Sequence, residues 1–330
     1  SSQNEQDSRF YGKFALVPVF EPSCQQETYE MTGYGFDLSE RFRIPVLMRL
    51  TTRMAHSRAV VETRDAKAQN EKSYPAEARQ WVLMPGNSRA RYKVLIEDYR
   101  KLEEEAASSR FNRLSDGPDK SMGIIACGIA YNYLMENFPD GCPYPVLKIS
   151  QYPLPTALVK RLAAECESLL VIEEGQPMVE EMIRGILGTP IPIKGRLSGE
   201  LPRTGELNPD CVREALGLEA HARHDASELV VPRPPALCMG CGHRDMYKAL
   251  TEVVREYPDS KVFSDIGCYT LGWLAPFHAI DTCVDMGASI TMAKGAADAG
   301  QHPSVAVIGD STFTHSGMTG LLDAVNERAD

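Results

Sequence analysis

Short apolar stretches alternate along this chain with segments in which apolar residues recur every three or four positions. Stretches of the first kind are typical of buried strands, and segments of the second kind are typical of helices that bury one face. The strands predicted in the first two thirds are 45–50, 123–128 and 168–172, and the helices are 129–138 and a segment from Pro177 to about Leu187. Strands that alternate with helices predict an α/β fold with parallel sheets.

The last hundred residues repeat this pattern as a separate α/β unit. Its predicted strands are Lys261–Ser264, 281–284 and 305–308, and each one enters a loop of small residues before a helix. In a parallel sheet such loops share one edge, where ligands bind. After the third strand, helical spacing predicts that one apolar stripe packs into the core, and its members are Met318, Leu321, Leu322 and Val325.

The middle of the chain has a different character. Apolar residues from Tyr92 to Leu102 fall on one face of a long predicted helix. Turn residues at 116–119 and a proline-rich stretch at 231–235 mark two boundaries.

Composition narrows the class of protein. The chain has 330 residues, 43% of them hydrophobic and 24% charged, which is typical of a globular protein with two or three domains. A net charge of −10 argues against nucleic acid or an anionic membrane as the main partner. No apolar run approaches the length of a membrane span, and no signal peptide is visible. Nine cysteines at irregular spacing favour a reducing cytoplasm over a disulfide framework.

The strand at 305–308 leads directly into Gly309 and Asp310. Glycine lets the backbone turn closely beside an anion, and an aspartate oxygen suits Mg²⁺, which takes its other ligands from phosphate and water. The alternative is that Asp310 simply caps the next helix. A comparable loop lies at 285–290, where the start of a helix could present free N–H groups to an anion or could only pack closely against a strand.

A CxxC motif occupies 238–241, and His243 follows it. Such a motif can be a redox pair, half a zinc site or part of an iron–sulfur ligand set. The sequence contains no second CxxC, which argues against a closed zinc site. His243 and His315 could each contact a substrate carboxylate or donate a proton, or could be structural.

The segment 309–318 resembles the diphosphate-binding half-motif of thiamine-diphosphate enzymes, and more closely that of indolepyruvate ferredoxin oxidoreductase alpha subunits, which are 2-oxoacid:ferredoxin oxidoreductases. Ser311 replaces the last glycine of the wider Gly-Asp-Gly motif, as in the nearest relatives. The resemblance implies thiamine diphosphate with Mg²⁺ on Asp310. It implies cofactor contacts from Gly267, Cys268, Gly287, Ala288, Ser289, Gly309, Asp310, Ser311 and Thr312. In the wider group Cys238, Cys241 and Cys268 would match ligands of a 4Fe-4S cluster, although these thiols could instead shape the pocket without iron.

The resemblance also implies a domain plan. Residues 1–62 would be the end of a pyrimidine-binding domain, 63–120 a helical connector, 121–222 a transketolase C-terminal-like domain, and 228–330 the start of the diphosphate-binding domain. The chain would then be an internal piece without the glutamate that activates thiamine, the second metal ligand or a ferredoxin-like domain that carries most of the iron–sulfur centres. The piece alone is therefore expected to be inactive.

The implied parent activity is oxidative decarboxylation of aryl pyruvates, with indolepyruvate as the lead candidate, to acyl-CoA. The implied partners are a beta subunit, ferredoxin, coenzyme A and the 2-oxoacid, in an oligomer. Two alternatives stay open. One is a non-redox thiamine-diphosphate 2-oxoacid decarboxylase, and the other is a non-catalytic structural subunit of the same fold.

Overall fold

The computed structural model describes residues 6–68, 85–187, 190–221 and 227–329. The chain forms two compact units, Ser1–Arg223 and His224–Asp330, here called unit 1 and unit 2. Parts of the predicted domains therefore lie outside the described residues, namely the first five residues, 69–84 of the connector, 188–189, 222 and 330. The boundary between the units falls between the third and fourth predicted domains, and the finer division of unit 1 remains a prediction.

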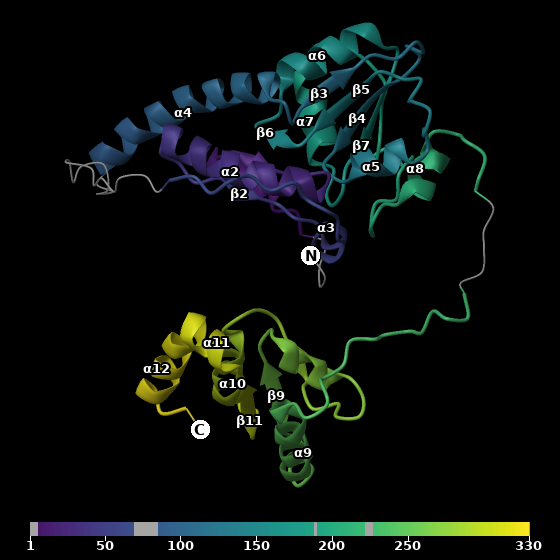
Figure 1. Cartoon of the computed structure of the whole chain (residues 1–330). Helices are drawn as coiled ribbons and strands as arrows, with labels where there is room; N and C mark the ends of the chain where they lie inside the picture. Colours follow the sequence, from purple (N-terminus) through teal and green to yellow (C-terminus); the bar gives the residue numbers. More distant parts are fainter. Residues whose placement is uncertain (1–5, 69–84, 188–189, 222–226, 330) are drawn as a thin grey trace. The chain divides into compact units, whose positions relative to one another are not determined.

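Unit 1 contains eight helices and eight strands within its described residues (Figure 1). In chain order they are α1 (Arg9–Ala15), β1 (Val19–Phe20), α2 (Gln25–Phe42), β2 (Leu47–Met48), α3 (Thr52–His56), α4 (Pro85–Ser108), β3 (Arg113–Ser115), β4 (Gly123–Cys127), α5 (Ala130–Met135), β5 (Val146–Ile149), β6 (Gln151–Tyr152), α6 (Thr156–Glu165), β7 (Leu169–Ile172), α7 (Met178–Ile186), β8 (Ile193–Lys194) and α8 (Pro209–Ala215).

A five-stranded sheet with the order β3-β5-β4-β7-β8 forms the centre of unit 1. Its strands are parallel except for β3, which pairs antiparallel with β5. Every residue of β4 is buried, because successive side chains enter two different cores. Ile125 packs in a core with residues of α6 and α7, and Ile124 packs in a second core with residues of α5 and α8. Burial on both faces explains the continuous apolar run in the sequence.

A second, three-stranded sheet in unit 1 has the order β2-β1-β6. Phe20 of β1 is fully buried with Leu38 of α2 and Leu102 of α4. The predicted long helix is confirmed as α4, but only its C-terminal part is anchored, since Tyr92 is 59% exposed. Near this end of α4, the Glu105 carboxylate accepts hydrogen bonds from Tyr34 and Arg41.

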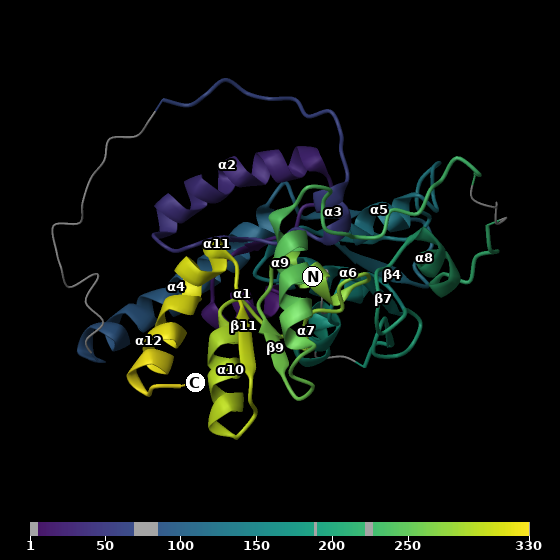
Figure 2. The same cartoon turned by 90° about the horizontal axis from the view of Figure 1, so that it is seen from below.

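Unit 2 is built on a parallel sheet with the order β10-β9-β11. Its elements are α9 (Gly242–Val254), β9 (Lys261–Ser264), the 3-10 helix η2 (Cys268–Trp273), β10 (Thr282–Cys283), α10 (Ala288–Asp298), β11 (Ser304–Val307), α11 (Asp310–Thr312), the π-helical turn η3 (Phe313–Gly317) and α12 (Met318–Asn326). Both views place α10 between β11 and α12 (Figure 1 and Figure 2). The three strands predicted from the sequence are thus confirmed within one or two residues.

The apolar stripe of α12 does not pack into the core, so that prediction is wrong. Its four side chains are between 43% and 64% exposed. The helix instead turns Gly320 toward α10, where an added Cβ would lie 2.9 Å from the Cγ2 atom of Thr291. Lys294 of α10 forms ion pairs with Asp323 of α12 and with Glu327, the residue directly after α12, which keeps the polar face of α12 against α10. Among the described helices, none combines the length and the apolar character that a membrane crossing requires.

Candidate functional site at the carboxyl edge of unit 2

The ring of Tyr269 joins two loops at the carboxyl edge of the unit 2 sheet. An added Cβ on Gly267, after β9, would lie 2.3 Å from the Tyr269 Cε1 atom, and one on Gly309, after β11, would lie 2.6 Å from it. The Tyr269 hydroxyl donates to Thr312 Oγ1 at 3.4 Å, and the Tyr247 hydroxyl donates to the Tyr269 carbonyl at 2.7 Å. Glycine is required at both positions because the ring packs directly on both backbones.

The third loop, which follows β10, is held by Asp265. The N–H groups of Gly287 and Ser289 donate to Asp265 Oδ1 at 2.8 and 2.9 Å. The sequence left two alternatives open for this turn, namely free N–H groups for an anion or close packing alone. The N–H groups of Gly287 and Ser289 are not free, since a buried carboxylate of the protein already accepts from them.

Asp310 lies exposed at the start of α11. Gly309, not Asp310, is the residue that caps this helix, and the Asp310 carboxylate accepts only from the adjacent Ser311 N–H, at 2.8 Å, among the residues described. The helix continues through the π-helical turn η3, a feature found often at functional sites. In that turn His315 Nδ1 lies 3.0 Å from the Ser316 hydroxyl, and the His315 ring is exposed.

His243 brings together two of the three cysteines predicted as a set. Its Nδ1 atom lies 3.4 Å from Cys241 Sγ and 3.6 Å from Cys268 Sγ. Its ring also packs edge-on against Tyr269, with 5.6 Å between the ring centroids. Cys238 is exposed. Within the described ranges, no group of three or more His, Cys, Asp or Glu side chains is arranged to hold a metal ion.

Comparison with known proteins gives this edge a context. A family model for the thiamine pyrophosphate enzyme C-terminal TPP-binding domain matches residues 265–330, which include all three loops. Indolepyruvate oxidoreductase subunit IorA of Methanothermobacter marburgensis is 39% identical over 99% of this chain and 56% of its own length. The IorA subunit of Archaeoglobus fulgidus is 36% identical over 100% of this chain and 55% of its own length.

Nearly the whole of this chain is therefore similar in sequence to part of the IorA subunits. The chain spans about half the length of the curated IorA relatives that it matches. A solved structure, that of 2-oxoglutarate:ferredoxin oxidoreductase from Magnetococcus marinus, aligns with a TM-score of 0.40 and 14% identity over 61% of this chain and 42% of the other.

The residues at this edge fit the diphosphate cofactor expected of an IorA-like TPP-binding domain. Glycines at 267 and 309 let the Tyr269 ring pack directly on two loops, and Gly287 lets Ser316 pack directly on the third, so the three loops lie close together. Asp310 offers a hard oxygen ligand to solvent beside them, as Mg²⁺ requires. A backbone cradle next to an exposed carboxylate is the donor set that a magnesium diphosphate needs.

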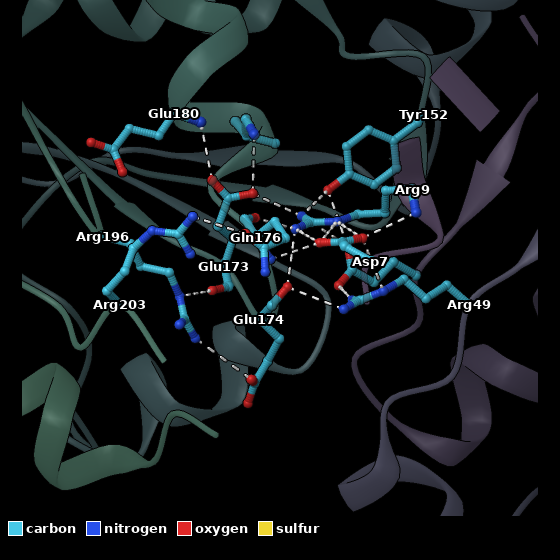
Figure 3. Close-up of polar contacts among 12 residues, drawn as sticks. Asp7, Arg9, Arg49, Tyr152, Glu173, Glu174, Gln176, Glu180, Arg196 and Arg203 are labelled. Carbon is cyan, nitrogen blue, oxygen red and sulfur yellow. Dashed lines mark hydrogen bonds and ion pairs between the residues drawn. The ribbon is translucent and has the colours of Figure 1, made fainter. Parts of the chain in front are cut away.

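A second polar cluster lies in unit 1 and is buried (Figure 3). The Arg9 guanidinium contacts Asp7 Oδ2 at 2.5 Å and Glu173 Oε2 at 2.9 Å, and lies 3.6 Å from Glu21 Oε2. Tyr152 donates its hydroxyl hydrogen to the same Glu21 oxygen at 3.0 Å. Because the side chains of Arg9 and its three carboxylate partners are at most 1% exposed, this cluster secures the N-terminal segment against the sheet and leaves no room for a ligand.

The pKa values of two carboxyl groups in this cluster are shifted in opposite directions. Burial would raise the pKa of Asp7, but hydrogen bonds from Arg9 and the charges of Arg9 and Arg49 outweigh it and hold that pKa below 3.8. For Glu173, burial is the larger effect and raises the pKa above its ordinary value, although Arg9 and two backbone N–H groups oppose it. The difference follows from geometry, because Asp7 faces two arginines and Glu173 faces one.

Three residues that organise the edge were absent from the site predicted by sequence, namely Asp265, Tyr269 and Ser316. Each acts through a contact with a residue distant in sequence, such as the contact of Tyr269 with Gly309. The one available signal was the position of Asp265 directly after a strand, in a loop already expected at the ligand edge.

Proposed function

We propose that the carboxyl edge of unit 2 binds magnesium thiamine diphosphate, and that the enzyme containing this chain oxidatively decarboxylates 2-oxoacids. The observation that supports this most is the convergence of three glycine-containing strand ends beside the exposed Asp310, inside the segment that matches a TPP-binding domain.

In this proposal Asp310 binds Mg²⁺ directly. The backbone of Gly309, Ser311 and Thr312 lies beside the diphosphate, and Thr312 is kept in place by its hydrogen bond with Tyr269. The loops that contain Gly267 with Cys268, and Gly287 with Ala288 and Ser289, form the other walls. Thiamine diphosphate, when bound, supplies the electron sink that decarboxylation of a 2-oxoacid needs.

The two histidines have distinct places in the proposed site. His315, exposed in η3, is suited to contact the substrate carboxylate or to donate a proton near the reacting carbon. His243 is half-buried between two thiols and Tyr269, so its role there is to order those side chains or to contact the substrate at the edge of the site.

We further propose that electrons leave through iron–sulfur chemistry to ferredoxin. Cys241 and Cys268 already share one histidine nitrogen, and Cys238 is accessible one turn before Cys241. Cysteine thiolates are the ordinary ligands of a 4Fe-4S cluster. For all three thiols to bind one cluster, Cys238 would have to move toward Cys241 and Cys268.

The substrate proposed is an aryl pyruvate, with indolepyruvate first, coenzyme A as acyl acceptor, and a beta subunit as partner in a cytoplasmic oligomer. This choice is supported by the names of the IorA relatives. The domain plan proposed for unit 1 is a pyrimidine-binding part at 1–62, a connector at 63–120 and a transketolase C-terminal-like part at 121–222.

Two other functions make different predictions. A non-redox decarboxylase would use the Asp310 edge but would have no need of Cys238, Cys241 and Cys268. A structural subunit would keep the fold without binding thiamine diphosphate.

Assays of the assembled protein that contains this chain distinguish these three candidate functions. With indolepyruvate, we expect reduction of methyl viologen that depends on coenzyme A and is lost in Asp310→Asn but not in the matched exposed variant Asp323→Asn. Release of carbon dioxide without viologen reduction would indicate the non-redox enzyme. Absence of cofactor binding by the wild-type assembly would indicate the structural subunit.

A further inference from the structure

The carboxylate of Asp265 is fully buried, and among the described residues it accepts hydrogen bonds from a single turn. Besides the N–H groups of Gly287 and Ser289, it accepts from the Ser289 hydroxyl at 2.6 Å through its other oxygen, Oδ2. The three donors lie within three consecutive residues. Hydrogen bonds to a buried charged acceptor are among the stronger ones, so this carboxylate fixes the conformation of the turn that begins α10.

The backbone of Asp265 connects the loop after β9 with the end of strand β11. Its N–H donates to the Val307 carbonyl, the last residue of β11, at 3.3 Å. Its carbonyl accepts from the Thr270 hydroxyl, which follows Cys268 in η2, at 3.0 Å. Asp265, which directly follows the central strand β9, therefore contacts the loops after β9 and β10 and the end of strand β11.

The turn that Asp265 holds rests directly on the helix that begins with Asp310. Gly287 has a φ of +104°, and an added Cβ would lie 2.1 Å from the Ser316 hydroxyl oxygen. That hydroxyl donates to the Met286 carbonyl at 2.6 Å. Ser316 belongs to the π-helical turn η3, which follows α11 without a break. Asp265 is therefore connected to the helix that begins with Asp310 by two successive contacts. It accepts a hydrogen bond from Gly287, and Gly287 packs against Ser316.

We propose that Asp265 is a positioning residue that sets the spacing between the Gly287 turn and the Asp310 loop, so that one magnesium diphosphate can meet both. The proposal rests on the function proposed above. Asp265 does not touch the cofactor, because its side chain is covered by the protein. It acts through the turn that it orders and through the packing of that turn on Ser316.

The variant that tests this is Asp265→Asn. The amide oxygen can still accept from the two backbone N–H groups, but an NH₂ group replaces the oxygen that accepts from Ser289, and the charge is lost. A matched control is Asp281→Asn. Asp281 also accepts a backbone hydrogen bond in the same sheet, from the Val262 N–H at 2.7 Å, but it lies at the amino end of the strands.

The first measurement needs no cofactor. Amide hydrogen exchange of the apo protein should be about tenfold faster in Asp265→Asn at 286–289 and also at 313–317, because losing a charge-assisted hydrogen bond costs about that factor in local opening. In Asp281→Asn both segments should exchange as in the wild type. Faster exchange confined to 286–289, or an equal effect in the control, would overturn the proposal.

The second measurement is the dissociation constant for thiamine diphosphate at fixed Mg²⁺, with kcat at saturating cofactor, in the assembled oxidoreductase. We expect affinity about tenfold weaker in Asp265→Asn, with kcat at saturation within about threefold. A merely structural role would lower the yield of folded protein and leave the affinity of the folded fraction unchanged. If the wild type binds no thiamine diphosphate, the proposed function fails, while hydrogen exchange still decides the role of Asp265.

Discussion

The Nδ1 atom of His243 lies 3.6 Å from the sulfur of Cys268, although 25 residues separate them in the sequence. The same nitrogen lies 3.4 Å from the sulfur of Cys241. Two thiols on different loops are therefore within reach of one ring atom. This contact joins the start of α9 to the loop after β9, where we place one wall of the cofactor site.

This geometry predicts that a short bifunctional thiol reagent such as dibromobimane links Cys241 to Cys268 in the folded protein. Peptide mass mapping should recover that pair, and Cys238→Ser should leave it in place. Recovery of Cys268 only in singly modified form would contradict the shared contact with His243.

Gly287→Ala should destabilise unit 2 by about 3 kcal/mol, since a left-handed backbone and a steric clash with Ser316 both oppose the new side chain. Gly300→Ala is the matched control, because Gly300 also has a positive φ, of +93°, but faces open space. Strain alone should cost the control about 1 kcal/mol. Urea unfolding measures both, and equal losses would show that the contact with Ser316 contributes nothing.

The sequence pattern predicts that the apolar stripe of α12 is buried in the core, but its exposure in the structure predicts that truncating it has little effect on stability. Leu322→Ala should change the free energy of unfolding by no more than about 0.5 kcal/mol, because the side chain is 62% exposed. Leu38→Ala in α2, where the side chain is fully buried, should cost about 2–5 kcal/mol. A loss in Leu322→Ala as large as that in Leu38→Ala would mean that α12 is buried.

Asp7→Asn should destabilise unit 1 in a manner that depends on pH. The folded pKa of Asp7 is lowered, so its stabilising effect is present above its ordinary pKa of 3.8 and is lost as pH falls through the lower folded value. The difference from the wild type should be about 3 kcal/mol at pH 7 and should shrink below pH 4. Asp37→Asn, which removes an exposed pair with Lys67, should show little effect at either pH. Denaturant unfolding across this range tests the sign.

Local pattern was sufficient for most of the strands. The runs that became β4, β7 and β9 are apolar and short, and a strand buried on both faces leaves just that signature. The edge of the unit 2 sheet could also be predicted, because parallel strands place their carboxyl ends together. The Gly309 and Asp310 loop was therefore expected where the structure has it.

Contacts distant in sequence were not accessible to the same reasoning. Nothing near Arg9 indicates that it pairs with Glu173, and nothing near Asp265 indicates that its carboxylate holds the turn at Gly287.

The prediction that the stripe of α12 packs into the core was wrong for a related reason. Helical periodicity shows that a face is apolar but not which neighbour covers it, and here Gly320 and Lys294 decide the orientation.

The central claim is that Asp310 binds the magnesium of a thiamine diphosphate at the carboxyl edge of unit 2. Calorimetric titration of thiamine diphosphate into the assembled protein that contains this chain, with and without Mg²⁺, tests it most directly. We predict binding that requires Mg²⁺, is at least about tenfold weaker in Asp310→Asn and is unchanged in Asp323→Asn. Binding of equal strength in wild type and Asp310→Asn, or binding that does not require Mg²⁺, would contradict the claim.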